Sequence, residues 1–213
     1  YYLRACTLLK EGNYESALAD FEKAFSLATD NLELVTSAYE EMQAAGFAEE
    51  GKTYIQNFMD QQDKKLTDSQ KGILYYYLED YANARIYLDG ALNGTDAKVS
   101  LMLGQTYEKL GDMNYAAVVY QTYLDANAPD AAIYSSLGNC YMKQEKYEDA
   151  LAAYEAGIEI GDSACLQSLK FNQIVANEYL GNFDKAKSLI TDYLSVYSED
   201  TKAQREAQFL QTR

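Results

Sequence analysis

The sequence points to an all-α protein built from consecutive pairs of short antiparallel helices. Six small residues recur 32 to 36 residues apart, at Ala17, Gly51, Ala84, Ala116, Ala150 and Ala186. Apolar residues beside them follow the spacing of an amphipathic helix, as at Ala17, Phe21 and Ala24. The 213 residues contain one proline and no long Ser/Gly tract, which argues against linkers and disorder. Such a period indicates stacked two-helix units that share a continuous core.

The stretch Ala131–Ala164 carries the pattern most completely. Counted from Ala131 as position 1, positions 4, 7, 8, 11, 20, 24 and 27 hold Tyr134, Leu137, Gly138, Tyr141, Ala150, Tyr154 and Gly157. This spacing resembles the tetratricopeptide repeat, a unit of about 34 residues. In such a unit small residues stand where two helices cross closely, and aromatic residues fill the gaps beside them. The resemblance implies a right-handed α-solenoid of antiparallel helix pairs.

We expect a single solenoid over residues 1–213, with units at about 1–31, 32–65, 66–96, 97–130, 131–164 and 165–200. In the first unit Gly12–Tyr14 forms the turn between the helices. Asp30 is expected to cap the following helix, with Glu33 completing a capping box. The second unit is irregular, because Tyr39 stands where a small residue is usual. Asp60–Lys65 is expected to be a polar loop.

The later units follow the pattern more closely. Lys71 replaces the usual Leu in the third unit, and Asn93-Gly94 ends its second helix; a hairpin turn is rejected because the flanking residues keep the helical period. Asp96 is the expected N-cap of the fourth unit, and Pro129-Asp130 starts the fifth.

The sixth unit departs from the pattern in its first helix. Gln173 and Asn177 stand where Leu and Tyr are usual, which leaves the register of that helix open. Residues 201–213 are expected to form a polar amphipathic helix with Ala203, Ala207 and Leu210 on one side. That helix would cap the open end of the solenoid.

Charge and composition exclude several function classes. The net charge of −15 repels nucleic-acid phosphates and anionic membrane surfaces. It indicates an acidic solvated surface, with attraction for basic partners as the alternative. Cys6, Cys140 and Cys165 lack the short spacings of a zinc site or a disulfide framework. No apolar run approaches the roughly 18 residues needed to span a bilayer, so we expect no membrane insertion in this segment.

The residues that usually carry catalysis are also missing. The chain has no histidine, which removes His-based acid/base pairs, catalytic triads and His metal ligands. It has no glycine-rich phosphate loop and no EF-hand loop. Neighbouring carboxylates such as Glu40 and Glu41 point in different directions on a helix, so they are poor acid/base pairs. We therefore expect no catalytic residues, no metal site and no cofactor.

The resemblance also implies where a partner would bind. In this family the first helices of the units line a concave groove. The groove positions give the candidate partner-binding residues Ile73, Tyr76, Tyr77, Lys98, Leu101, Met102, Gln105, Asn139, Met142, Phe171, Asn172 and Val175. The Lys and Asn that grip a C-terminal carboxylate in one subclass are absent from the first three units, so a chaperone-tail clamp is not expected. Tyr76, Tyr77, Leu101 and Met102 form the expected hot spot, or they pack against the chain itself.

The predicted function is a non-enzymatic scaffold or adaptor that binds a peptide or protein segment in the concave groove. The alternative is a structural self-association or spacer module of a larger, membrane-anchored bacterial protein, since an uncovered solenoid end invites stacking. An enzyme with a carboxylate site has only acidic residues in its favour. A nucleic-acid reader of the pentatricopeptide type is opposed by the net charge. The identity of the partner and the oligomeric state stay open.

Localisation is addressed by weaker features. The closing run QREAQFLQTR resembles the end of repeat proteins found as bacterial membrane-anchored lipoproteins, which favours an extracytoplasmic, anchored bacterial protein. The free cysteines favour the cytoplasm as the alternative. The chain begins within a unit and without Met, so we expect a further segment before Tyr1.

Overall fold

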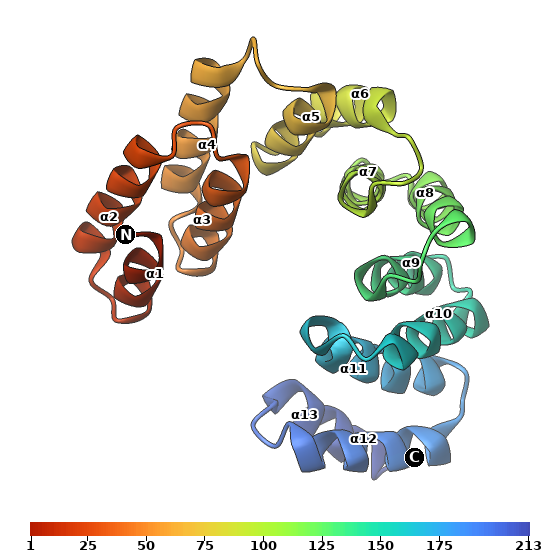
Figure 1. Cartoon of the computed structure of the whole chain (residues 1–213). Coiled ribbons are helices and arrows are strands. Elements are labelled where there is room, and N and C mark those ends of the chain that lie inside the picture. The colour runs from red at the N-terminus through yellow and green to blue at the C-terminus, as the bar shows by residue number, and fades with distance from the viewer. The chain divides into compact units, whose positions relative to one another are not determined.

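Thirteen α-helices and no strand make up the computed structural model, which describes all 213 residues (Figure 1). This confirms the all-α prediction. The helices form two compact units, Tyr1–Leu92 and Asn93–Arg213, which are described one at a time.

The first unit contains three helix pairs. Its helices are α1 (Tyr2–Lys10), α2 (Tyr14–Leu27), α3 (Leu32–Ala44), α4 (Ala48–Gln62), α5 (Asp68–Tyr77) and α6 (Tyr81–Ala91). Each pair packs face to face, and α1 also packs on α3. One core cluster gathers around Phe21 and Met42, and a second around Ile55 and Leu74. The core is therefore a strip between consecutive helices, as expected for stacked pairs.

The second unit contains three more pairs and one further helix. Its helices are α7 (Ala97–Lys109), α8 (Met113–Ala126), α9 (Ala131–Lys143), α10 (Tyr147–Ile160), α11 (Ser163–Tyr179), α12 (Phe183–Val196) and α13 (Thr201–Leu210). Within this unit α7, α9 and α11 pack in succession along one side, and α8 and α10 lie on the other (Figure 1). The first helices of the pairs therefore form one continuous wall.

Glycines make the helix crossings close in both units. A Cβ atom added at Gly104 would lie 2.2 Å from Cε1 of Tyr120, and one at Gly138 would lie 2.4 Å from Cε1 of Tyr154. The second pair reverses the arrangement, because the large residue is Tyr39 and the glycine is Gly51, whose added Cβ would lie 2.9 Å from the Tyr39 ring. The irregularity seen at Tyr39 in the sequence is thus compensated across the same crossing.

The recurring small residues occupy the positions expected of them. The alanines are fully buried, with 0% exposure at Ala17, Ala84, Ala116, Ala150 and Ala186. Gly51, the sixth member, is also buried. A larger side chain at any of these positions would separate two helices that share the core.

The turn inside each pair uses a left-handed residue at one repeated position. Glycine occupies it in most pairs, for example at Gly111 with a φ of 87°. Glu79 and Glu145 occupy it in the remaining two pairs, with φ values of 62° and 60°. Because L-residues with a side chain are strained in this region, both glutamates are less favourable there than glycine.

Aspartates begin several helices, as the sequence indicated. Asp96 accepts hydrogen bonds from the backbone N–H groups of Lys98 and Val99, and Asp130 caps α9 in the same way. The prediction for α3 is wrong by one residue, since Asn31 rather than Asp30 caps it and accepts from Leu34 N at 2.9 Å. Both residues have cap-forming side chains, so the helix start decides which one acts.

The predicted loop Asp60–Lys65 is partly wrong, because α4 continues through Gln62. The Gln62 side chain is buried, and its Nε2 atom donates to the carbonyl oxygen of Thr29 at 3.0 Å. This contact spans 33 residues, and it anchors the last turn of α4 to the segment that follows α2.

Polar residues are accommodated inside the first helix of the sixth pair. Asn177 is 3% exposed, and its Nδ2 atom donates to the Gln173 carbonyl at 2.9 Å. The apolar packing comes instead from residues such as Leu169 and Ile174, which are 0% and 1% exposed. The buried amide thus takes the place of an aromatic ring by bonding to the backbone of its own helix.

The last helix covers the apolar end of the preceding pair. Ala203 and Leu210 of α13 are buried in a cluster with Phe171, Ile190 and Tyr193. Asp200 caps α13 and also accepts a hydrogen bond from the Tyr193 hydroxyl at 2.6 Å. Helix α13 therefore depends on both a small apolar face and a shared polar anchor.

Candidate functional site

The candidate residues of the first unit lie in a tyrosine cluster. The rings of Tyr76 and Tyr77 are 5.9 Å apart, and Tyr77 also contacts Tyr39 edge to face. The Tyr77 hydroxyl donates to the Glu40 carboxylate; burial and this contact raise the pKa of Tyr77. Ile73 is 5% exposed. The side chain of Ile73 is therefore covered by the chain, and both tyrosines are half-buried.

Two candidate residues of the second unit are also covered by the chain. Met102 is 5% exposed and Phe171 is 6% exposed. Phe171 packs against Tyr193, with the Lys202 ammonium 4.5 Å from its ring centre. Ile73, Met102 and Phe171 are thus corrected from groove contacts to packing residues, because burial leaves almost none of each side chain accessible to a partner. The remaining candidates Lys98, Leu101 and Gln105 lie on α7 and are exposed or half-buried.

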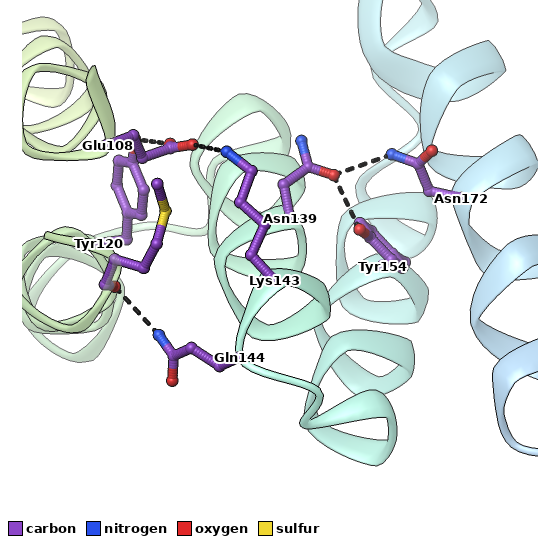
Figure 2. A network of polar contacts seen from close by, with 8 residues as sticks. Glu108, Tyr120, Asn139, Lys143, Gln144, Tyr154 and Asn172 are labelled. Carbon is purple, nitrogen blue, oxygen red and sulfur yellow. Dashed lines mark hydrogen bonds and ion pairs between the residues drawn. The ribbon is translucent and has the colours of Figure 1, made fainter. Parts of the chain in front are cut away.

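Four candidate residues meet in one hollow of the second unit. Asn139, Met142, Asn172 and Val175 come from α9 and α11 and line a space of about 290 Å³. Glu108, Lys143 and Tyr154 complete the lining. Figure 2 shows the polar members of this set, which approach one another from three successive helix pairs.

Two asparagines form the centre of the hollow. The Oδ1 atom of Asn139 accepts from the Tyr154 hydroxyl at 2.8 Å and from Nδ2 of Asn172 at 3.1 Å. Tyr154 is 1% exposed, so it holds the Asn139 amide from below in a fixed orientation. The Nδ2 atom of Asn139 and the Oδ1 atom of Asn172 point away from these bonds (Figure 2). The NH2 group of Asn139 and the Oδ1 atom of Asn172 therefore have no hydrogen-bond partner in the chain.

An ion pair closes one edge of the hollow. Lys143 Nζ lies 3.1 Å from Oε2 of Glu108, whose Oε1 accepts from the Tyr120 hydroxyl at 2.8 Å. The carboxylate thereby links α7, α8 and α9, and Gln144 adds a bond from its Nε2 to the Met113 carbonyl at 3.0 Å (Figure 2). These contacts connect the first two helix pairs of the second unit along one edge of the hollow.

The ionisable groups beneath the hollow are held in their neutral forms. Burial, followed by the nearby Glu108 carboxylate, raises the pKa of Tyr120. Burial raises the pKa of Tyr154 as well, and burial and Glu108 together raise the pKa of Cys140 to about 12. A thiol and phenols with such pKa values are poor nucleophiles and poor bases near neutral pH. The arrangement is suited to binding through amides and apolar groups.

Glu108, Lys143 and Tyr154 were not among the candidates. The family's groove positions are 2, 5, 6, 9, 12 and 13 of each unit. Glu108 is position 12 of the unit that starts at Ala97, and Lys143 is position 13 of the unit that starts at Ala131, so the same counting could have found them. Tyr154 stands on a second helix, where it was identified only as a packing residue. Its hydroxyl reaches the hollow because Gly138 lets the ring pass close to α9.

No helix in the structure combines the length and the apolar character required to cross a lipid bilayer.

Models of the tetratricopeptide repeat match residues 1–31, 97–130 and 131–161 of this chain. Over 92 residues the chain is 28% identical to the anaphase-promoting complex subunit CDC16 of Saccharomyces cerevisiae, a match that covers 39% of this chain and 11% of that protein. The chain thus spans about a tenth of the length of this relative.

Solved structures show the same architecture at low sequence identity. A thermophilic TPR protein of Thermus thermophilus is similar with a TM-score of 0.67 and 12% identity, covering 86% of this chain and 100% of that one. YrrB, described as a TPR protein with an unusual peptide-binding site, is similar with a TM-score of 0.59 and 18% identity, covering 88% of this chain and 97% of that one. These similarities concern the fold.

Proposed function

Because the chain belongs to the tetratricopeptide repeat family, we propose that it is a non-enzymatic scaffold that binds a peptide or protein segment in the hollow of its second unit. The observation that carries this proposal is the fixed pair of amides at Asn139 and Asn172. Both residues lie on the first helices of their pairs, where the family's concave groove is expected.

The amide pair suits the backbone of an extended segment. A peptide group presents one C=O acceptor and one N–H donor, and the unbonded Nδ2 of Asn139 and Oδ1 of Asn172 offer the complementary groups. The hydroxyl of Tyr154 orients Asn139 before any partner arrives. Groups that are already oriented lose less entropy on binding, so each hydrogen bond contributes more to affinity.

Apolar groups beside the amides supply a place for one side chain. Met142 and Val175 line the same hollow and are half-buried. Methionine adapts its shape to different apolar groups, so the fit does not demand one residue type. The volume of about 290 Å³ lies at the lower end of ligand pockets, which suits a short segment better than a large cofactor.

The charges of Lys143 and Glu108 at the edge of the hollow affect how fast the partner associates. Lys143 keeps 53% of its side-chain surface exposed, so its pair with Glu108 contributes little to stability. A charge at this edge mainly changes the association rate and its dependence on salt.

The test uses a phage-displayed library of random linear peptides, selected on the intact chain. Enriched peptides are then synthesised and titrated against the wild type, Asn172→Leu and the control Asn114→Leu. Asn114 lies exposed on α8, so the control makes the same substitution outside the hollow. Loss of the amide contacts should weaken binding at least about tenfold in Asn172→Leu. The control should bind as the wild type does.

Two outcomes would contradict the proposal. Enriched peptides that bind Asn172→Leu with wild-type affinity would place the binding surface elsewhere. A library that yields no binder would oppose recognition of short linear segments. Light scattering over a concentration series on the same sample tests the self-association alternative, which requires a mass that rises with concentration.

A further inference from the structure

Two carboxyl groups face each other between α11 and α13. Glu178 lies in the last turn of α11 and Glu206 lies within α13; their side chains line one hollow, and a hydrogen bond between the two carboxyl groups is among the causes that raise the pKa of Glu178. The Oε1 atom of Glu178 is buried, and no donor of the chain reaches it. A buried acceptor without a donor is unusual, because its desolvation is not compensated.

No cation of the chain neutralises this pair. Arg205 and Arg213 line the same hollow of about 660 Å³ as the two carboxyl groups, yet neither forms an ion pair with Glu178 or Glu206. The Arg213 guanidinium lies 4.9 Å from the centre of the Phe209 ring instead. On α12, Lys187 Nζ donates to the carbonyl oxygen of Arg213 at 2.9 Å. The only charged group in hydrogen-bonding contact with Glu178 is therefore another carboxyl group.

A shared proton removes the electrostatic repulsion between the two carboxylates. Burial, followed by the hydrogen bond and the charge of Glu206, raises the pKa of Glu178 to about 8. With one proton between them, one carboxyl group donates to the other; without it, two negative charges face each other.

Helix α13 is held by a small contact. Its buried side chains are Ala203 and Leu210, supported by the partly buried Ala207, and it packs mainly on α12. We propose that Glu178 and Glu206 form a proton-dependent latch, which holds α13 against the second unit while a proton is shared and loosens it when that proton is lost.

The direction follows from proton linkage. The docked state holds the proton more tightly than the undocked state, in which the Glu178 carboxyl group titrates near its ordinary value. Docking is therefore strongest below the ordinary pKa of a glutamate, weakens as the pH rises from there to about 8, and changes little above that value. Each opening releases up to one proton, so the opening equilibrium can rise up to about tenfold per pH unit in this window. Opening uncovers the apolar side chains of Phe171, Ile190 and Tyr193, which would favour association.

Hydrogen exchange of α13 tests the latch directly. Wild type, Glu178→Gln, Glu206→Gln and the control Glu159→Gln are compared at each pH from 6 to 9, so that the intrinsic pH dependence of exchange cancels. Glu159 is an exposed carboxylate of α10 outside the hollow, and the control makes the same change in net charge. Between pH 6 and 8.5 the opening of α13 should rise at least about tenfold in wild type and in the control. It should stay nearly constant in both pair variants.

Three results would overturn the proposal. The first is an equal pH dependence in wild type and Glu178→Gln. The second is loss of the pH dependence in Glu159→Gln, which would assign it to net charge. The third is a carboxyl titration of Glu178, followed by carbon NMR in the wild type, at its ordinary pKa. If Glu178→Gln fails to fold, Glu206→Gln and the NMR titration decide the matter.

Discussion

The substitution Gly138→Ala probes the close crossing that positions the hollow. A methyl group at this position would lie 2.4 Å from Cε1 and 2.7 Å from Cδ1 of Tyr154. Relaxed contacts between carbon atoms are about 3.5–4.0 Å, so the ring has to move by about 1 Å. Tyr154 is 1% exposed and its hydroxyl is bonded to Asn139, so the surrounding core resists that movement.

Two opposing effects set the magnitude. Replacing glycine by alanine inside a helix is normally favourable by up to about 1 kcal/mol. Overpacking a close-packed core costs about 1–3 kcal/mol. We therefore expect Gly138→Ala to lower the free energy of unfolding by up to about 2 kcal/mol. It should also weaken peptide binding, because the displaced ring no longer orients Asn139.

Gly90→Ala is the matched control, since Gly90 lies in α6 with no atom within 4 Å of an added Cβ. It should stabilise the protein by up to about 1 kcal/mol. Urea unfolding followed by circular dichroism measures the transition midpoints of both variants. The reasoning is refuted if Gly138→Ala raises the midpoint as Gly90→Ala does. It is also refuted if Gly138→Ala lowers the free energy of unfolding by the same amount in the Tyr154→Leu background as in the wild type.

Three further predictions concern caps, turns and acid stability. Asp200→Ala removes the cap of α13 and the partner of the Tyr193 hydroxyl, so the free energy of unfolding, measured by urea titration, should fall by about 1–2 kcal/mol. The control is Asn13→Ala, at an N-cap without a side-chain hydrogen bond, and it should have little effect. Glu145→Gly relieves the strain of a left-handed backbone conformation, so it should raise the free energy of unfolding by up to about 1 kcal/mol in urea titrations. A lower free energy of unfolding would contradict the strain argument. The Arg4 guanidinium holds the pKa of Asp20 below its usual range. The ion pair therefore stabilises the fold above the ordinary pKa of aspartate, and this stabilisation is lost as the pH falls through the lowered pKa. Between pH 5 and pH 2 the midpoint temperature of thermal unfolding should therefore fall more steeply for the wild type than for Arg4→Met. Equal slopes for the two proteins would contradict a stabilising role of this ion pair.

The local sequence pattern was sufficient to predict the helices and how they pair. The small residues from Ala17 to Ala186 recur with the period of one helix pair, and each pair forms most of its contacts with itself and its neighbours. In such an array the information needed for packing lies within a few tens of residues. The caps at Asp96 and Asp130 were found for the same reason, because a cap depends on the next three residues.

Features that rest on a distant contact were missed or misplaced. The extra turn of α4 depends on the bond from Gln62 to Thr29, and the role of Tyr154 depends on its passage beside Gly138. Asp30 and Asn31 have nearly equal capping ability, so the sequence could not separate them.

The family resemblance predicts that the first helices of the pairs carry the binding surface, and the helical period assigns each of their residues to a face. It did not show which of those residues stay accessible. Ile73, Met102 and Phe171 share the chemistry of a contact surface, yet all three are buried in the fold. Asn139 and Asn172 meet because consecutive pairs bring side chains 33 residues apart within 3.1 Å. Spacing along a chain sets a residue's face, whereas burial and hydrogen bonding depend on the helix that packs next to it.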